Sequence, residues 1–153
     1  MSEEINKNTI RAYEDDILGG LLAAADFRNN TVPIEIVRNG AVMIKFSIKP
    51  LSEEEYLKCR DRHTKFIRNK QLGMKIPEHT DTAQYRNELI YQATIDEDRD
   101  KLWNNKAAWK KLNVINGVEL IGHILMAGEK DAICDKLDEI SGYSTTQEEV
   151  AKN

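Results

Sequence analysis

The chain has 153 residues, a net charge of −4 at pH 7, and 41% hydrophobic against 31% charged residues. This size and composition predict a soluble globular protein whose core needs no disulfide bond. No run approaches the roughly 18 apolar residues of a membrane span, and the acidic start MSEEINKNTIRAYEDD is unlike a secretory signal. Cys59 and Cys134 are expected to be reduced thiols. Together these features predict a cytoplasmic protein that does not bind a membrane.

The excess negative charge lies at the C-terminal end. Residues 1–127 carry 19 basic and 19 acidic groups, whereas residues 128–153 carry three basic and seven acidic ones. A protein that binds nucleic acid through phosphate contacts needs the opposite sign. Nucleic acid is therefore an unlikely main partner.

The N-terminal segment, residues 1–30, is expected to be flexible or partly helical. Within it, ILGGLLAAADF over residues 17–27 reads as a short helix or a docking segment. Gly19-Gly20 is expected to interrupt that helix, because each glycine costs roughly 1 kcal/mol relative to alanine.

A β-hairpin is the clearest local signal. In TVPIEIVRNGAVMIKFSIKP, apolar residues alternate with other residues on both sides of Asn39-Gly40. This dipeptide favours the positive φ angles of a type I′ turn, and Pro33 indicates an edge strand. Since a lone hairpin is marginally stable in water, it must pack on helices or pair with other strands.

A helix is predicted to begin after Ser52, which forms a capping box with Glu55. The residues expected to face the core, from their helical spacing, are Tyr56, Cys59, His63, Phe66 and Ile67. Its other face is basic and carries Lys58, Arg60, Arg62, Lys65, Arg68 and Lys70. That face is either solvated or in contact with an acidic partner or the chain's own acidic tail.

The remaining chain reads as a loop followed by helices. Residues 71–80 contain a glycine and a proline and predict a loop; the next helix is capped by Thr80 or Asp81. A helical stretch with Trp103 and Trp109 follows, then a final pair over residues 113–127 and 129–140. The predicted fold class is α+β: an N-terminal β-hairpin packed on a mostly α-helical body that ends in a helix pair. Residues 31–143 are expected to form this single domain, and residues 144–153 a mobile acidic tail.

No motif indicates an enzyme, a cofactor or a metal. Asp96, Asp98 and Asp100 begin like a calcium loop, but the sixth position is Lys101 instead of glycine and the twelfth is Ala107 instead of glutamate. An acidic cluster at a helix start explains them.

Cys59 and His63 share one helix face, yet zinc needs three or four ligands, and His79 and His123 belong to no companion motif. The sequence contains no GxSxG, HExxH, CxxC, Walker or GxGxxG pattern. We therefore predict no catalytic residues and no metal or cofactor site.

The segment 113–127 is apolar around most of its circumference if it forms one helix. At roughly 100° per residue, Asn116, Glu119 and His123 fall within about 60°, which leaves an apolar arc on the order of 260°. Gly128 is expected to end this helix in the left-handed conformation. Either the monomer buries the whole arc, or a residual groove accepts an apolar helix from another chain.

The C-terminal segment LNVINGVELIGHILMAGEKDAICDKLDEISGY resembles the ending of the XkdN-like tail assembly chaperones of contractile-tailed bacteriophages and defective prophages. Residues 124–129 match the family step LL-x-x-GE, and residues 140–143 its close I-x-x-L/I-S-G-Y/F. The hairpin running into FSIKPLSEEEY and the later YRNELIYQATI agree in order and spacing, so the resemblance covers roughly residues 30–143. One departure is IDED at residues 95–98, where a proline is expected soon after the preceding Ala-Thr pair.

The resemblance implies a non-enzymatic chaperone in the cytoplasm of the bacterial host. Such proteins bind the apolar, helical tape measure protein during tail tube assembly and are absent from the mature virion. In many phages a frameshifted, longer form recruits tail tube subunits, which makes the tail tube protein a second implied partner. Residues predicted to lie near the binding surface are Leu120, Ile121, Ile124, Leu125, Ile133, Leu137 and Tyr143.

Two other functions stay open from the sequence alone. A small helical nucleic-acid-binding regulator would use the basic residues between 58 and 70. A structural homo-oligomer would bury the apolar arc of residues 113–127 against copies of itself.

Overall fold

The computed structural model describes residues 14–143. The chain divides into two units between residues 30 and 31, and each unit is described by itself. The expected mobile tail over residues 144–153, and the part of the N-terminal segment before residue 14, lie outside the described residues.

The first unit contains the helix α2 (Ile17–Phe27). No residue of α2 is buried. The Asp16 carboxylate accepts a hydrogen bond of 2.9 Å from the backbone N–H of Gly19, which satisfies one free donor of the first turn. The helix runs without a break through Gly19-Gly20. The expected interruption there is therefore wrong, because the cap and the following run of leucine and alanine favour helix on both sides of the glycines.

The second unit begins with the predicted hairpin, β1 (Val32–Arg38) and β2 (Ala41–Ile48). Asn39 and Gly40 both have positive φ, 53° and 75°, as the predicted turn requires. Ile36, Phe46 and Ile48 point into the core. The hairpin is confirmed as an element packed on helices.

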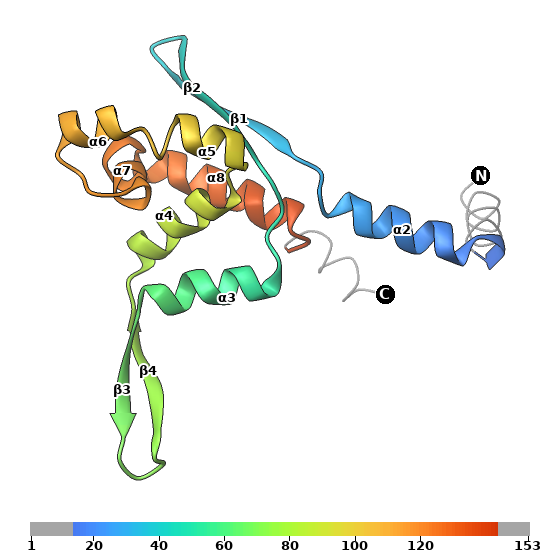
Figure 1. Ribbon diagram of the computed structural model, residues 1–153, viewed down its shortest axis with the longest axis horizontal. Helices are drawn as coiled ribbons and strands as arrows, with labels where there is room; N and C mark the ends of the chain where they lie inside the picture. The colour runs from blue at the N-terminus through green and yellow to red at the C-terminus, as the bar shows by residue number, and fades with distance from the viewer. Residues whose placement is uncertain (1–13, 144–153) are drawn as a thin grey trace. The chain divides into compact units, whose positions relative to one another are not determined.

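Six helices follow the hairpin in the described part of the second unit (Figure 1). They are α3 (Glu53–Arg62), α4 (Thr82–Ala93), α5 (Asp96–Lys101), α6 (Lys106–Leu112), α7 (Gly117–Ile124) and α8 (Ala127–Ile140). The capping box of Ser52 and Glu55 is present at the start of α3, and Asp81 caps α4. The α+β fold class predicted from the sequence is confirmed.

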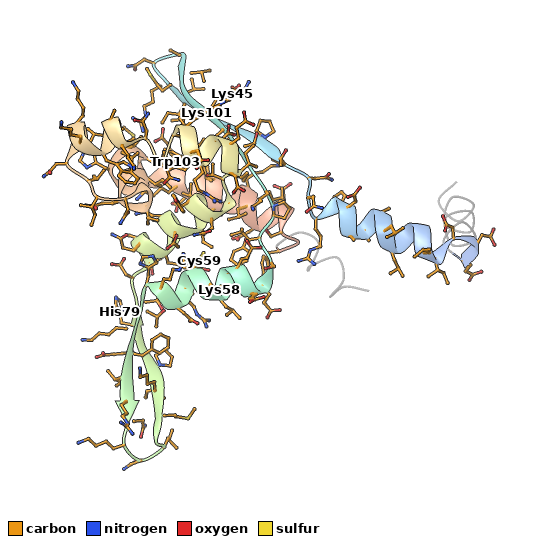
Figure 2. The ribbon with its side chains drawn as sticks, viewed as in Figure 1. Lys45, Lys58, Cys59, His79, Lys101 and Trp103 are labelled. Carbon is orange, nitrogen blue, oxygen red and sulfur yellow. The ribbon has the colours of Figure 1, made fainter. Side chains whose placement is uncertain are left out.

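Trp103 holds the hairpin and the helices together (Figure 2). It is fully buried and meets the ring of Phe46 edge-on, with 5.4 Å between the ring centroids. Its indole N–H donates to the Thr94 hydroxyl at 3.0 Å, and that hydroxyl donates to the Ile90 carbonyl at 2.7 Å. This network gives the indole nitrogen a partner where water is excluded.

A second β-hairpin is present where the sequence predicted the end of a helix and a loop. The helix expected to continue through Ile67 ends at Arg62, and β3 (Thr64–Asn69) pairs with β4 (Met74–Thr80) where a loop was predicted. Phe66 and Ile67 are exposed strand residues, so their assignment to the core is wrong, whereas Tyr56 and Cys59 are buried as expected. The hairpin extends away from the helices (Figure 1).

The turn of this hairpin explains why the strands form. The Asn69 side chain accepts from the backbone N–H groups of Gln71 and Leu72, and Gly73 takes a φ of 66°. A side-chain turn of this kind competes with helix and reverses the chain.

The expected long apolar helix over residues 113–127 is not formed: within this range only α7 and the first residue of α8 are helical. Asn116 caps α7 by accepting from the Glu119 N–H at 2.8 Å, so the preceding residues are a loop. Leu125 and Met126 have extended backbone conformations and separate α7 from α8. Gly128 lies in the first turn of α8, so its predicted role as a helix end is wrong. The apolar arc of 260° does not exist, because its residues do not share one helix.

No helix in residues 14–143 is long and apolar enough to cross a membrane.

Candidate partner-binding surfaces

The seven residues predicted to bind a partner occupy two environments. Those in the core, with exposed fractions between 0 and 5%, are Leu120, Ile121, Leu125, Ile133 and Leu137. Ile124 is half-buried, and Tyr143 is 37% exposed. Partner binding through this set stays a prediction, and only Ile124 and Tyr143 offer surface for it in the folded chain.

Tyr143 lies beside a cleft of about 430 Å³ between α3, α4 and the end of α8. Its ring meets that of Tyr56 edge-on at 5.4 Å, and the Tyr56 hydroxyl donates to Asp138 at 3.0 Å. Burial raises the pKa of Tyr56 above its ordinary range. The phenol is therefore a neutral hydrogen-bond donor in this wall of the cleft.

Ile124 lies where the first hairpin is fastened to the helices. The Arg38 guanidinium donates to the Ile124 carbonyl at 2.8 Å and to both carboxylate oxygens of Glu129, at 2.6 and 3.1 Å. Glu129 also accepts from the Met126 N–H at 2.8 Å. The hydrogen bond from Arg38 lowers the pKa of Glu129 below its usual range. These contacts fix the extended break between α7 and α8.

The helix α2 exposes a group of large apolar side chains. Its large side chains Ile17, Leu18, Leu21, Leu22 and Phe27 are between 50 and 69% exposed. At roughly 100° per residue, the first four lie within about 140° of arc and form one stripe. We call these four residues the α2 stripe. Exposed apolar surface of this extent is typical of interaction sites.

The predicted basic helix face is divided between two elements. Lys58, Arg60 and Arg62 lie on α3, whereas Lys65, Arg68 and Lys70 belong to β3 and its turn, so a single basic helix face is wrong. Lys58 is on α3 and His79 on β4 (Figure 2). Arg68 stands opposite Lys75 in the hairpin, and like charges directly opposite destabilise a strand pair.

The polar clusters noted in the sequence have structural roles. Asp98 accepts from the Ser47 N–H at 2.7 Å and ties the start of α5 to β2. Burial raises the pKa of both Cys59 and Cys134 to about 11, so neither thiol is activated at neutral pH. Residues 14–143 contain no group of three His, Cys, Asp or Glu side chains placed to hold a metal ion.

Comparison with protein-family models identifies the family of the chain, which the geometry alone does not. The model for the phage XkdN-like tail assembly chaperone protein matches residues 20–153, which includes most of α2 and the whole second unit. No curated protein and no solved structure matches the chain significantly. Because the family match spans most of the sequence, the chain belongs to the XkdN-like family of phage tail assembly chaperones.

Proposed function

We propose that this chaperone binds an apolar helical segment of the tape measure protein and keeps it soluble during tail tube assembly. It acts without catalysis, in the cytoplasm of the bacterial host, and leaves before the virion is complete. Membership of the tail assembly chaperone family supports this proposal. The observation that carries it is the α2 stripe, whose four aliphatic side chains are each at least half exposed.

The α2 stripe has the chemistry needed to pair with another helix. The helix has 11 residues and is about 16 Å long at 1.5 Å per residue. Isolated helices of this length are marginal in water, so packing against a partner helix would stabilise α2 while covering apolar surface on both chains. Leu18, Leu21 and Leu22 stand at i, i+3 and i+4, the spacing of the first three anchors in helix-in-groove recognition.

The size of α2 also suits a temporary partner. One short helix buries less than the roughly 800 Å² per partner of a standard stable interface. A polymerising tube could therefore displace each chaperone copy, while several copies together cover a long tape measure helix. The sequence-based candidates Ile124 and Tyr143 stay predictions for the same partner at two further, separate places in the second unit.

Co-expression with the tape measure protein tests the proposal through Leu22→Asp, with Leu72→Asp as the matched control. Both leucines are exposed, Leu22 at 63% on α2 and Leu72 at 65% in the turn of the second hairpin. Burying a leucine contributes about 1.5–3 kcal/mol, so Leu22→Asp should reduce capture of the tape measure protein about tenfold or more. Leu72→Asp should capture it as well as the wild type.

Both variants should unfold at the wild-type temperature, because neither side chain is in the core. Equal capture by Leu22→Asp and wild type would exclude the α2 stripe. In that case Ile124→Asp, checked for folding by circular dichroism, would test the surface predicted from the sequence. Loss of capture by both leucine variants would show an effect of added charge and would contradict a specific role for α2.

A further inference from the structure

A groove of about 400 Å³ lies in the second unit between β1 and α8. Its α8 wall consists of Glu129, Ala132 and Ile133, and its other wall is the run of five successive β1 residues from 33 to 37. Successive residues of a strand point to opposite faces of the sheet. A groove lined by five in a row therefore follows the backbone edge of the strand, not one of its faces.

The two edges of the β1–β2 sheet differ in their hydrogen bonding. The outer edge of β2 is occupied, because the backbone N–H of Ser47 donates to Asp98 at 2.7 Å and its carbonyl accepts from the Ile95 N–H at 3.0 Å. Ser47 stands opposite Pro33 and directs both of its backbone groups away from β1. The outer edge of β1 differs, since within residues 14–143 no third strand pairs with it.

The same register shows which β1 groups face the groove. Antiparallel strands alternate between residue pairs that exchange hydrogen bonds and pairs that do not. Because Pro33 and Ser47 form a pair of the second kind, Glu35 and Lys45, two residues along, do so as well. The Pro33 carbonyl and the N–H and carbonyl of Glu35 are therefore directed outward. Both residues are exposed, and in the described range 14–143 these groups have no backbone partner outside the sheet.

The groove also offers apolar contacts beside these polar groups. Ile34 of β1 is half-buried and Ala132 of α8 is exposed, and both line the groove next to the buried Ile36 and Ile133. A segment that pairs with the β1 edge would place every second side chain over these residues. Its other side chains would face solvent beside Glu35.

We propose that this groove binds an extended segment of a partner protein as a third strand on β1. The alternating N–H and carbonyl groups of a strand edge are complementary to another extended backbone, which commits the site to a polypeptide. The Glu35 carboxylate faces solvent beside the added strand, so a basic side chain opposite it is favoured. The inference rests neither on tape measure binding nor on the α2 stripe.

A second copy of this chain is a poorer occupant of the edge. Antiparallel pairing of two β1 strands about their middle puts Glu35 opposite the same residue of the second copy, and like charges directly opposite destabilise a strand pair. A shift toward the start of the strand puts Glu35 opposite Pro33, which has no N–H to donate. A shift toward the turn shortens the paired stretch.

The test is an NMR titration of the isotope-labelled full chain with acetyl-Val-Lys-Val-Lys-Val-amide, a strand probe in which basic and apolar residues alternate. Saturable shifts of the Glu35 amide and Ala132 methyl signals are expected, one from each wall of the groove. The same peptide with N-methylated lysines should bind at least about tenfold more weakly, because it cannot donate to the Glu35 carbonyl. The acidic probe acetyl-Val-Glu-Val-Glu-Val-amide should bind at least about threefold more weakly than the basic one.

Two proline variants separate the edge from the fold. Glu35→Pro removes the outward N–H and should abolish saturable binding. Lys45→Pro is the matched control, because it places the same ring at the paired position on the other edge of the sheet; it should bind the probe like the wild type. Both should melt close to the wild-type temperature, since proline is tolerated where the N–H points away from the ladder. If both prolines unfold the chain, the N-methylated peptide decides.

The proposal is overturned if the basic probe gives no saturable shift, or if the N-methylated or the acidic peptide binds as well as it does. Unchanged binding by folded Glu35→Pro, or equal loss of binding by folded Lys45→Pro, would also contradict it. The Glu35 N–H should exchange fast in the free chain and slowly in the complex. Slow exchange in the free chain would show that the chain itself or a second copy already covers this edge, and would refute the proposal.

Discussion

At the scale of residues, one arginine connects three segments of the second unit. Arg38 at the end of β1 binds Glu129 of α8 and the carbonyl of Ile124 at the end of α7. Glu129 also caps the Met126 N–H. The pair therefore holds the hairpin to the helices and fixes the break between them. Its two charged ends are far apart in the sequence, so composition and spacing could not predict it.

Glu129→Gln should reveal this pair through the pH dependence of stability. The pKa of Glu129 is lowered in the folded state, so its stabilisation is fully present above the unfolded value of about 4.3 and is lost as the pH falls below it through the lower pKa of the folded state. Thermal melts should show the variant a few degrees less stable than wild type at pH 7. The difference should shrink toward pH 3, and a difference of equal size at both pH values would contradict the account.

At the residue scale, the sequence pattern could not separate the members of the predicted binding set that are buried from those that are accessible. An apolar side chain at helical spacing favours burial, but the pattern does not say whether its own chain or a partner covers it. Leu120, Ile121 and Leu137 have the same pattern as docking residues and are instead core.

At the scale of elements, local signals succeeded where backbone chemistry is specific. The Asn39-Gly40 turn and the capping box at Ser52 were predicted correctly, because each needs only neighbouring residues. The break at Leu125 and Met126 has neither glycine nor proline, and the strands β3 and β4 lack an alternating buried face. Those two features therefore gave no periodic signal, and both were missed.

Removal of the β3–β4 hairpin should leave the helical body folded. Residues 65–79 would be replaced by Gly-Gly between Thr64 and Thr80, whose hydroxyls lie 2.7 Å apart at the hairpin base. Phe66, Ile67, Leu72 and Met74 are all exposed, so their loss removes little core. Cooperative melting near the wild-type temperature is expected by circular dichroism.

Phe46→Ala in the first hairpin is the contrasting control. Its ring is buried against Trp103, and removal of a buried phenylalanine costs about 3–5 kcal/mol. If the hairpin deletion destabilises the chain as much as Phe46→Ala, the second hairpin is part of the core and this description of it is wrong.

At the scale of the whole molecule, apolar surface is distributed unevenly between the two units. The second unit has a buried core that includes Trp103 and also exposes large apolar residues such as Ile115 and Met126, whereas the described part of the first unit exposes every large residue of α2 and buries none. Under the proposed function, a helix of the partner would cover the α2 stripe, and membership of the tail assembly chaperone family implies protein partners in tail assembly.

Hydrogen exchange on the full chain, with and without the tape measure protein, tests this account most directly. Free α2 amides should exchange fast, since isolated short helices open readily. In the complex, the amides of residues 17–27 should exchange at least about tenfold more slowly, because packing of the stripe stabilises the helix. Unchanged exchange in residues 17–27, with protection confined to the second unit, would contradict binding through α2.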